Sequence, residues 1–198
     1  MKQGFAIKWA GVALGVAGLG ACVNLGGGAK APAQLFELSP AMTWAPGTTL
    51  SAAPGAALVV VEPETDRSLA VARVAVQVDA TSMAYLKDGQ WVERPARLFR
   101  SLMAETIRAR GKRLVVEDDA EARGNLHLSG RLIALGYDAH NRSAVVRYDA
   151  LWQDASGAIA MRRFEAVEKN VAPKATAVAP ALNRAANRVA ADVADWVK

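Results

Sequence analysis

A mostly apolar segment in the first half of the chain has the period-two pattern of a strand. In residues 69–78, every second side chain is apolar, and the expected inner face holds Ala72, Val74, Val76 and Val78. Arg73, Ala75 and Gln77 fall on the opposite face, which is typical of a half-buried strand. Two more strands are expected earlier, at 34–39 and 57–62, separated by a loop over 40–55 that is rich in Pro, Thr and Gly.

Two segments have helical rather than strand periodicity. Residues 96–110 place Leu98, Leu102 and Ile107 at helical spacing, and Gly111 is a suitable stop signal. A second helix is predicted at the C-terminus, where one apolar face holds Val178, Leu182, Ala185, Val189, Val193 and Trp196. Because proline lacks an amide hydrogen, we expect Pro180 to lie in the first turn of that helix.

The second half of the chain predicts a run of strands. A short strand at 113–117 precedes a polar turn at 118–124, and strand-like runs follow at 125–137, 143–152 and 158–168. Their short, turn-rich connections favour an antiparallel meander. The expected fold class is therefore α+β: a mixed, largely antiparallel sheet packed by two main helices in a single domain.

The N-terminal residues have the order of a secretory signal. Lys2 and Lys8 precede an apolar run, and the 13 uncharged residues from Trp9 to Ala21 are fewer than the ~20 needed to span a membrane. Leu19-Gly20-Ala21 stands directly before Cys22, the single cysteine of the chain. This pattern resembles the bacterial lipobox, which implies a signal peptide over 1–21 and diacylglycerol plus an N-acyl chain on Cys22. An unmodified thiol is the alternative.

Residues 22–33 are predicted to be a lipidated flexible tether, and residues 34–198 the folded domain, because the tether carries three consecutive glycines without periodicity. Val23 is not the aspartate associated with inner-membrane retention, so the outer membrane, on its periplasmic face, is the expected location. Removing Lys2 and Lys8 lowers the formal charge from +5 to +3. Scattered basic residues and export both argue against a nucleic-acid partner.

The sequence carries no arrangement typical of catalysis or metal binding, so we expect no enzymatic activity and no cofactor beyond the acyl chains. His127 falls in a predicted strand and His140 in a predicted turn, and neither has an evident partner. The acidic residues at 117–121 lack the spacing of a calcium loop, and a solvated turn is the favoured interpretation.

The candidate contact residues are Tyr85 and Trp91, which interrupt the polar segment 84–95 directly before the first helix. Exposed aromatic residues often mark protein contacts. The alternative is that both rings pack inward and fix the approach to the helix.

The segment MAYLKDGQWVERPARLFRSLMAETI, together with QLFELSP and the final amphipathic helix, resembles the ABC-type transport auxiliary lipoprotein family associated with MCE-type lipid transport. Tyr85, Trp91, Pro95 and Trp196 match its pattern, whereas residues 125–168 match no motif of it. The resemblance implies a non-enzymatic, membrane-tethered accessory subunit of a transporter that moves phospholipids or similar lipids between the two membranes. The ATPase, the permease and the MCE-domain subunit would be separate partners, and a ring-like homo-oligomer is also implied.

Two other functions remain open from the sequence. A lipoprotein activator of a peptidoglycan synthase needs a long reach, whereas the 11 residues from Val23 to Ala33 span at most ~40 Å when extended. An isolated lipid-binding or structural lipoprotein is the third alternative.

Overall fold

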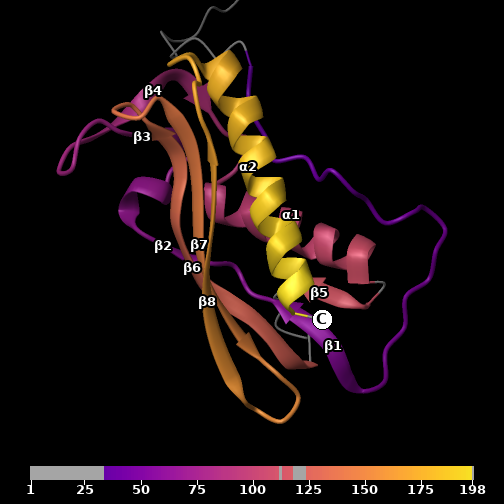
Figure 1. Ribbon diagram of the computed structural model, residues 1–198. Coiled ribbons are helices and arrows are strands. Elements are labelled where there is room, and N and C mark those ends of the chain that lie inside the picture. The colour runs from indigo at the N-terminus through magenta and orange to yellow at the C-terminus, as the bar shows by residue number, and fades with distance from the viewer. Residues whose placement is uncertain (1–33, 112, 118–123, 198) are drawn as a thin grey trace, which may run out of the picture. The chain divides into compact units, whose positions relative to one another are not determined.

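The computed structural model describes residues 34–111, 113–117 and 124–197, which all belong to one compact unit, Pro32–Lys198. These residues form one eight-stranded sheet and two α-helices (Figure 1). The elements, in chain order, are β1 (Gly55–Val60), β2 (Glu64–Thr65), the 3-10 turn η1 (Arg67–Leu69), β3 (Arg73–Gln77), β4 (Met83–Gln90), α1 (Pro95–Gly111), β5 (Val115–Glu117), β6 (Gly124–Asp138), β7 (Ser143–Gln153), β8 (Ile159–Glu168) and α2 (Ala175–Trp196).

The central strand of the sheet is β6. Along one edge it pairs in parallel with β1, then β2, then β3, so these three short strands follow one another end to end. Along its other edge it pairs antiparallel with β7, which pairs antiparallel with β8. The two long ladders are therefore antiparallel and the ladders of β1, β2 and β3 with β6 are parallel, and the expected α+β class with a mixed, largely antiparallel sheet is confirmed.

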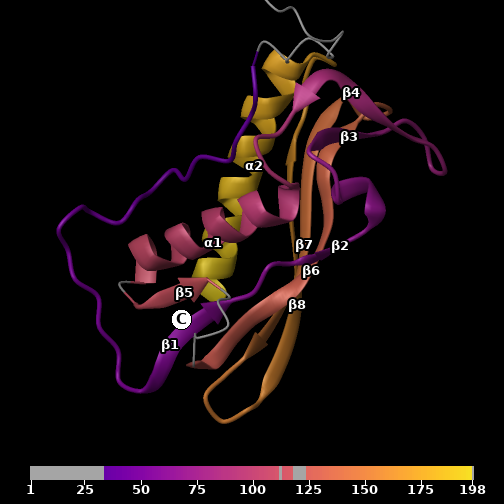
Figure 2. The ribbon, with the colours of Figure 1, turned by 180° about the vertical axis from the view of Figure 1, so that it is seen from behind.

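Both helices lie on one face of the sheet, as Figures 1 and 2 show from opposite sides. Pro95 is the first residue of α1, where its missing amide hydrogen would have no helical partner in any case. Phe99 of α1 reaches the sheet and meets the ring of Tyr148 edge-on at 5.3 Å. We call the sheet surface under the helices the helix face and the other surface the open face.

The second helix packs closely because its buried side is rich in alanine. Ala181, Ala185, Ala186 and Ala190 are fully buried between larger residues such as Leu182 and Val189. A small side chain lets the helix backbone approach the sheet and α1 without leaving voids. This explains how a chain with much alanine still forms a continuous core.

The expected position of Pro180 is wrong. The helix begins at Ala175, so Pro180 lies in its second turn rather than its first. Its missing amide hydrogen leaves the carbonyl of Thr176 without a helical donor. Both residues are exposed, so water can reach that carbonyl and satisfy it, and the helix continues past Pro180.

Two strand predictions also need correction, and one strand was not expected. In the segment expected as a first strand, 34–39, only Phe36 forms a bridge, with Trp91. The segment 69–78 starts with the end of η1 and contains a shorter strand, and Val78 is exposed although an inward position was expected. The unexpected strand is the edge strand β4, which contains residues 84–90 of the polar segment before α1 and pairs with β3.

Candidate partner-contact site

The structure places the two aromatic contact candidates in different environments. Trp91 follows β4 and is 1% exposed, within the hydrophobic core, whereas Tyr85 on β4 is half-buried. Cys22, the predicted lipidation site, lies outside the described residues. Trp91 as an exposed contact is therefore contradicted, and Tyr85 remains the candidate of the pair.

The backbone at Trp91 and Val92 joins three segments of the chain, and the Trp91 ring packs in the core. Its amide donates to the carbonyl of Ala72 at 3.2 Å, and the neighbouring Val92 amide donates to the carbonyl of Phe36 at 2.8 Å. Its indole Nε1 has no hydrogen-bond partner among the described residues. The ring therefore contributes apolar burial rather than a polar contact.

Tyr85 lies on the open face, directly opposite Ala75 of β3. Its hydroxyl donates a long hydrogen bond, 3.4 Å, to the carbonyl of Ser68 in η1. The guanidinium of Arg73 lies 4.6 Å from the centre of the tyrosine ring, within the range of a cation–π contact. These contacts fix the ring at the rim of a hollow on the open face.

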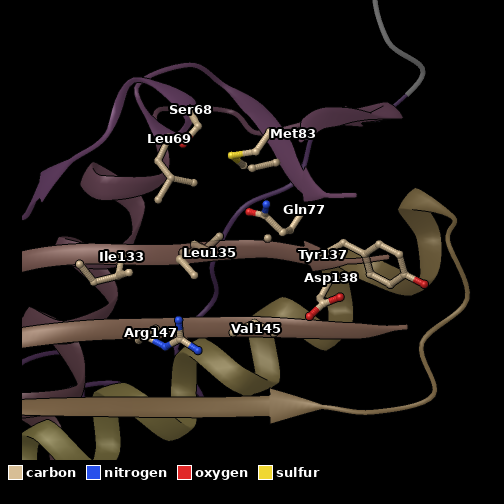
Figure 3. Close-up of a pocket in the computed structure, with 13 residues that line it drawn as sticks. Ser68, Leu69, Gln77, Met83, Ile133, Leu135, Tyr137, Asp138, Val145 and Arg147 are labelled. Carbon is tan, nitrogen blue, oxygen red and sulfur yellow. The ribbon is translucent and has the colours of Figure 1, made fainter. Parts of the chain in front are cut away.

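That hollow is a pocket of about 160 Å³, which we call the open-face pocket (Figure 3). Figure 3 shows Leu69 and Met83 on one side of it and Val145 and Arg147 on the other. The pocket is lined by Ser68, Leu69, Ala75, Gln77, Met83, Ile133, Ala134, Leu135, Gly136, Tyr137, Asp138, Val145 and Arg147.

The strands create this pocket by one close approach and one irregularity. A Cβ on Gly136 would lie 2.5 Å from the carbonyl oxygen of Ala75, so only glycine allows β3 and β6 to pair at this point. The ladder between β6 and β7 shifts register between Leu132 and Ala134, which leaves Ile133 as an extra residue. The glycine thus supplies a floor without a side chain, and the bulged Ile133 lines the pocket.

The carboxylates at the pocket are engaged by neighbouring donors. Asp138 accepts hydrogen bonds from the backbone amide of Asn141 at 2.9 Å and from its side-chain amide at 2.7 Å. These bonds hold the pKa of Asp138 below its ordinary value. On the same face, Arg147 forms an ion pair with Glu165 of β8.

A second feature concerns the chain that leads from the predicted tether into the domain. The amides of Ser39 and Ala41 donate to the side-chain oxygens of Asn183 and Asn187 at 2.9 and 2.7 Å. Asn187 also donates to the carbonyl of Ser39 at 2.9 Å. Side-chain amides of α2 thus take the place of a neighbouring strand, which the sequence pattern did not indicate.

A third feature is an exposed apolar surface near the tip of the β7–β8 hairpin, which projects past the end of α2 in Figures 1 and 2. Leu151 lies opposite Met161 in the ladder, and Ile159 is nearby. Their exposed fractions are 36%, 74% and 64%. The strand alternation predicted the strands but not which apolar residues stay uncovered.

The two histidines lie in different parts of the structure and do not form a shared site. His127 lies within β6, paired with Val59 and Gln153, and His140 is exposed in the turn after β6. Among the residues that the structure describes, no group of His, Cys, Asp or Glu is arranged to hold a metal ion.

Comparisons with known proteins give one family. The family model of the ABC-type transport auxiliary lipoprotein component matches residues 36–194. No curated protein sequence matches the chain. Within the described residues, no helix has the length and apolar character needed to span a membrane.

Solved structures share the fold at low sequence identity. A protein of Xanthomonas campestris from the family DUF330 is 16% identical, with a TM-score of 0.69 over 83% of this chain and 94% of that one. An uncharacterized protein is 13% identical, with a TM-score of 0.63 over 74% of this chain and 95% of the other. The PelC dodecamer subunit of Paraburkholderia phytofirmans is 20% identical over 74% of this chain and 92% of its own, with a TM-score of 0.41.

Proposed function

The chain belongs to the family of ABC-type transport auxiliary lipoprotein components, and from this premise we propose that it serves an MCE-type transporter. It would be the lipid-anchored periplasmic accessory subunit of a system that moves phospholipids or related lipids between the inner and outer membranes. Family membership over most of the folded domain is the observation that carries this proposal.

The proposed anchor is the acylated Cys22 in the inner leaflet of the outer membrane. Stable anchoring takes two acyl chains or more, which a diacylglycerol and an N-acyl group supply. The tether of 11 residues then keeps the domain within ~40 Å of its membrane. Because Asn183 and Asn187 hold residues 39–41 against α2, the segment that follows the tether would be fixed to the domain near the middle of that helix.

The proposed role is non-enzymatic. The open-face pocket, the rim around Tyr85 and the exposed hairpin tip are surfaces for contacts, with an MCE-domain subunit or another copy of the chain as candidate partners. The ATPase, permease and MCE-domain subunit would supply energy coupling and the lipid path as separate polypeptides.

Affinity purification of the full-length, C-terminally tagged protein from native membranes tests the proposal. We expect an ATPase, a permease and an MCE-domain protein to co-purify with the wild type. The Cys22→Ser variant should be lost from the membrane fraction and should recover these partners poorly. Recovery of a peptidoglycan synthase without transporter subunits would contradict the proposal and favour the activator function.

A further inference from the structure

The size of the open-face pocket restricts what it can accept. Its volume is about 160 Å³, and an apolar cavity of about 150 Å³ holds a molecule of the size of benzene. The two acyl chains of a phospholipid require far more space. One apolar side chain of leucine or phenylalanine size fits, and Leu69, Ala75, Met83 and Val145 supply apolar walls for it.

The rim of the pocket has the composition of a protein-contact site. Met83 is 48% exposed beside the half-buried Tyr85, although both belong to a paired strand. Tyrosine, methionine and arginine are enriched where proteins bind one another, and binding energy is concentrated where a side chain fills a pocket. The arrangement therefore favours a protein segment over a free metabolite.

The charges around the pocket favour an acidic segment. The carboxylates of Asp66 and Glu165 form ion pairs with Arg131 and Arg147. Asp138 is hydrogen-bonded by the neutral side chain of Asn141 and keeps its negative charge. By contrast, Arg67, next to Ser68, and Arg73, above Tyr85, make no ion pair with any residue of the described ranges. On β4, the adjacent Lys87 and Asp88 cancel in net charge. Among the described residues, Arg67 and Arg73 thus have no carboxylate partner, and together they outnumber Asp138, the carboxylate of the pocket lining that has no cationic partner.

We propose that the open-face pocket receives one apolar side chain from an acidic segment of a partner protein, with Arg67 and Arg73 pairing with the flanking carboxylates. Under the proposed function that segment belongs to a transporter subunit. The pocket itself is defined without reference to the transporter, so peptide binding and co-purification test the two proposals separately.

Peptide binding to the full-length acylated protein in lipid nanodiscs provides the test, with methionine methyl groups labelled with ¹³C for NMR. The probe is an acetylated pentapeptide with a central leucine and two acidic residues on each side. We expect saturable shifts of the Met83 methyl signal, whereas Met161, which is 74% exposed on β8, should not shift. A central alanine, or lysine flanks, should weaken binding at least tenfold.

A matched pair of variants separates filling of the pocket from general disturbance of the sheet. Val145→Phe places a ring in the pocket and should abolish the Met83 response. Val167→Phe makes the same change directly across the β7–β8 ladder, outside the pocket lining, and should preserve it. The melting temperatures of both variants identify any loss due to unfolding.

Three results would overturn the proposal. The first is equal binding of leucine and alanine peptides, and the second is full binding by folded Val145→Phe protein. The third is a Met83 shift with added lysophosphatidylethanolamine and none with the acidic peptide, which would make the pocket a lipid site. If the peptide binds as expected while no transporter subunit co-purifies, the pocket proposal stands and the proposed function fails.

Discussion

Replacing Trp91 tests whether this residue supports the fold or a partner contact. Its side chain is 1% exposed in the core, and its amide links the chain before α1 to the carbonyl of Ala72. Truncation of a buried tryptophan to alanine lowers the free energy of unfolding by about 3–5 kcal/mol. Since about 1 kcal/mol shifts the melting temperature by roughly 2–4 °C in a domain of this size, Trp91→Ala should lower it by about 6–20 °C.

Trp91→Phe gives a sharper expectation, because the indole Nε1 has no partner among the described residues. A buried donor without a partner costs about 1–3 kcal/mol, and phenylalanine removes that donor while keeping most of the apolar ring. The two effects oppose each other, so Trp91→Phe should change the free energy of unfolding by only about 1 kcal/mol.

The assay is urea and thermal unfolding of the full-length protein, followed by circular dichroism, beside the co-purification experiment. Trp44→Ala is a matched control, because Trp44 is half-buried in the loop before β1 and its Nε1 donates to the carbonyl of Thr48 at 3.1 Å. This control should lose about 1 kcal/mol. A loss below about 1 kcal/mol for Trp91→Ala, combined with lost partner association, would refute the buried role.

Three further predictions follow from the other contacts. Asn187→Ala should speed hydrogen exchange of residues 36–41 with little change in the melting temperature, and unchanged exchange would show that Asn187 does not hold this segment. The hydrogen bond from Arg184 lowers the pKa of Glu168, so its stabilisation is complete above the ordinary carboxyl pKa and is lost as pH falls through the lowered value. Glu168→Gln should therefore lower the free energy of unfolding by about 1 kcal/mol at pH 7 and by nothing near pH 2; an equal loss at both pH values would contradict an ionic role. Substituting His127 and His140 with glutamine should leave lipid-barrier function in cells intact, and its loss in folded protein would argue for enzymatic chemistry.

The local periodicity of the sequence determined the elements whose burial depends on one face. Helix α1 and the β6–β8 meander were predicted to within a few residues, because apolar side chains recur in them at 3.6 or 2 residues. The helical pattern of 178–197 likewise predicted α2, although not its start. These periods reflect which side of an element faces the core, and the fold class followed from their order.

Only the tertiary structure decided which strands pair and which aromatic residue is covered. The segments 57–62 and 69–78 were expected as independent strands, yet β1, β2 and β3 align end to end on β6. Gly136 permits this close pairing, and its lack of a Cβ, together with the bulged Ile133, produces the open-face pocket.

Tertiary contacts also decided the positions of the candidate contact residues and of the first segment of the domain. Tyr85 and Trp91 stand in similar polar surroundings in the sequence, but the bridge with Phe36 draws Trp91 into the core while Tyr85 stays at the rim. Asn183 and Asn187 hold residues 39–41 across more than 140 positions of sequence. Periodicity describes one element against solvent, whereas these positions depend on contacts between distant segments, which no local pattern encodes.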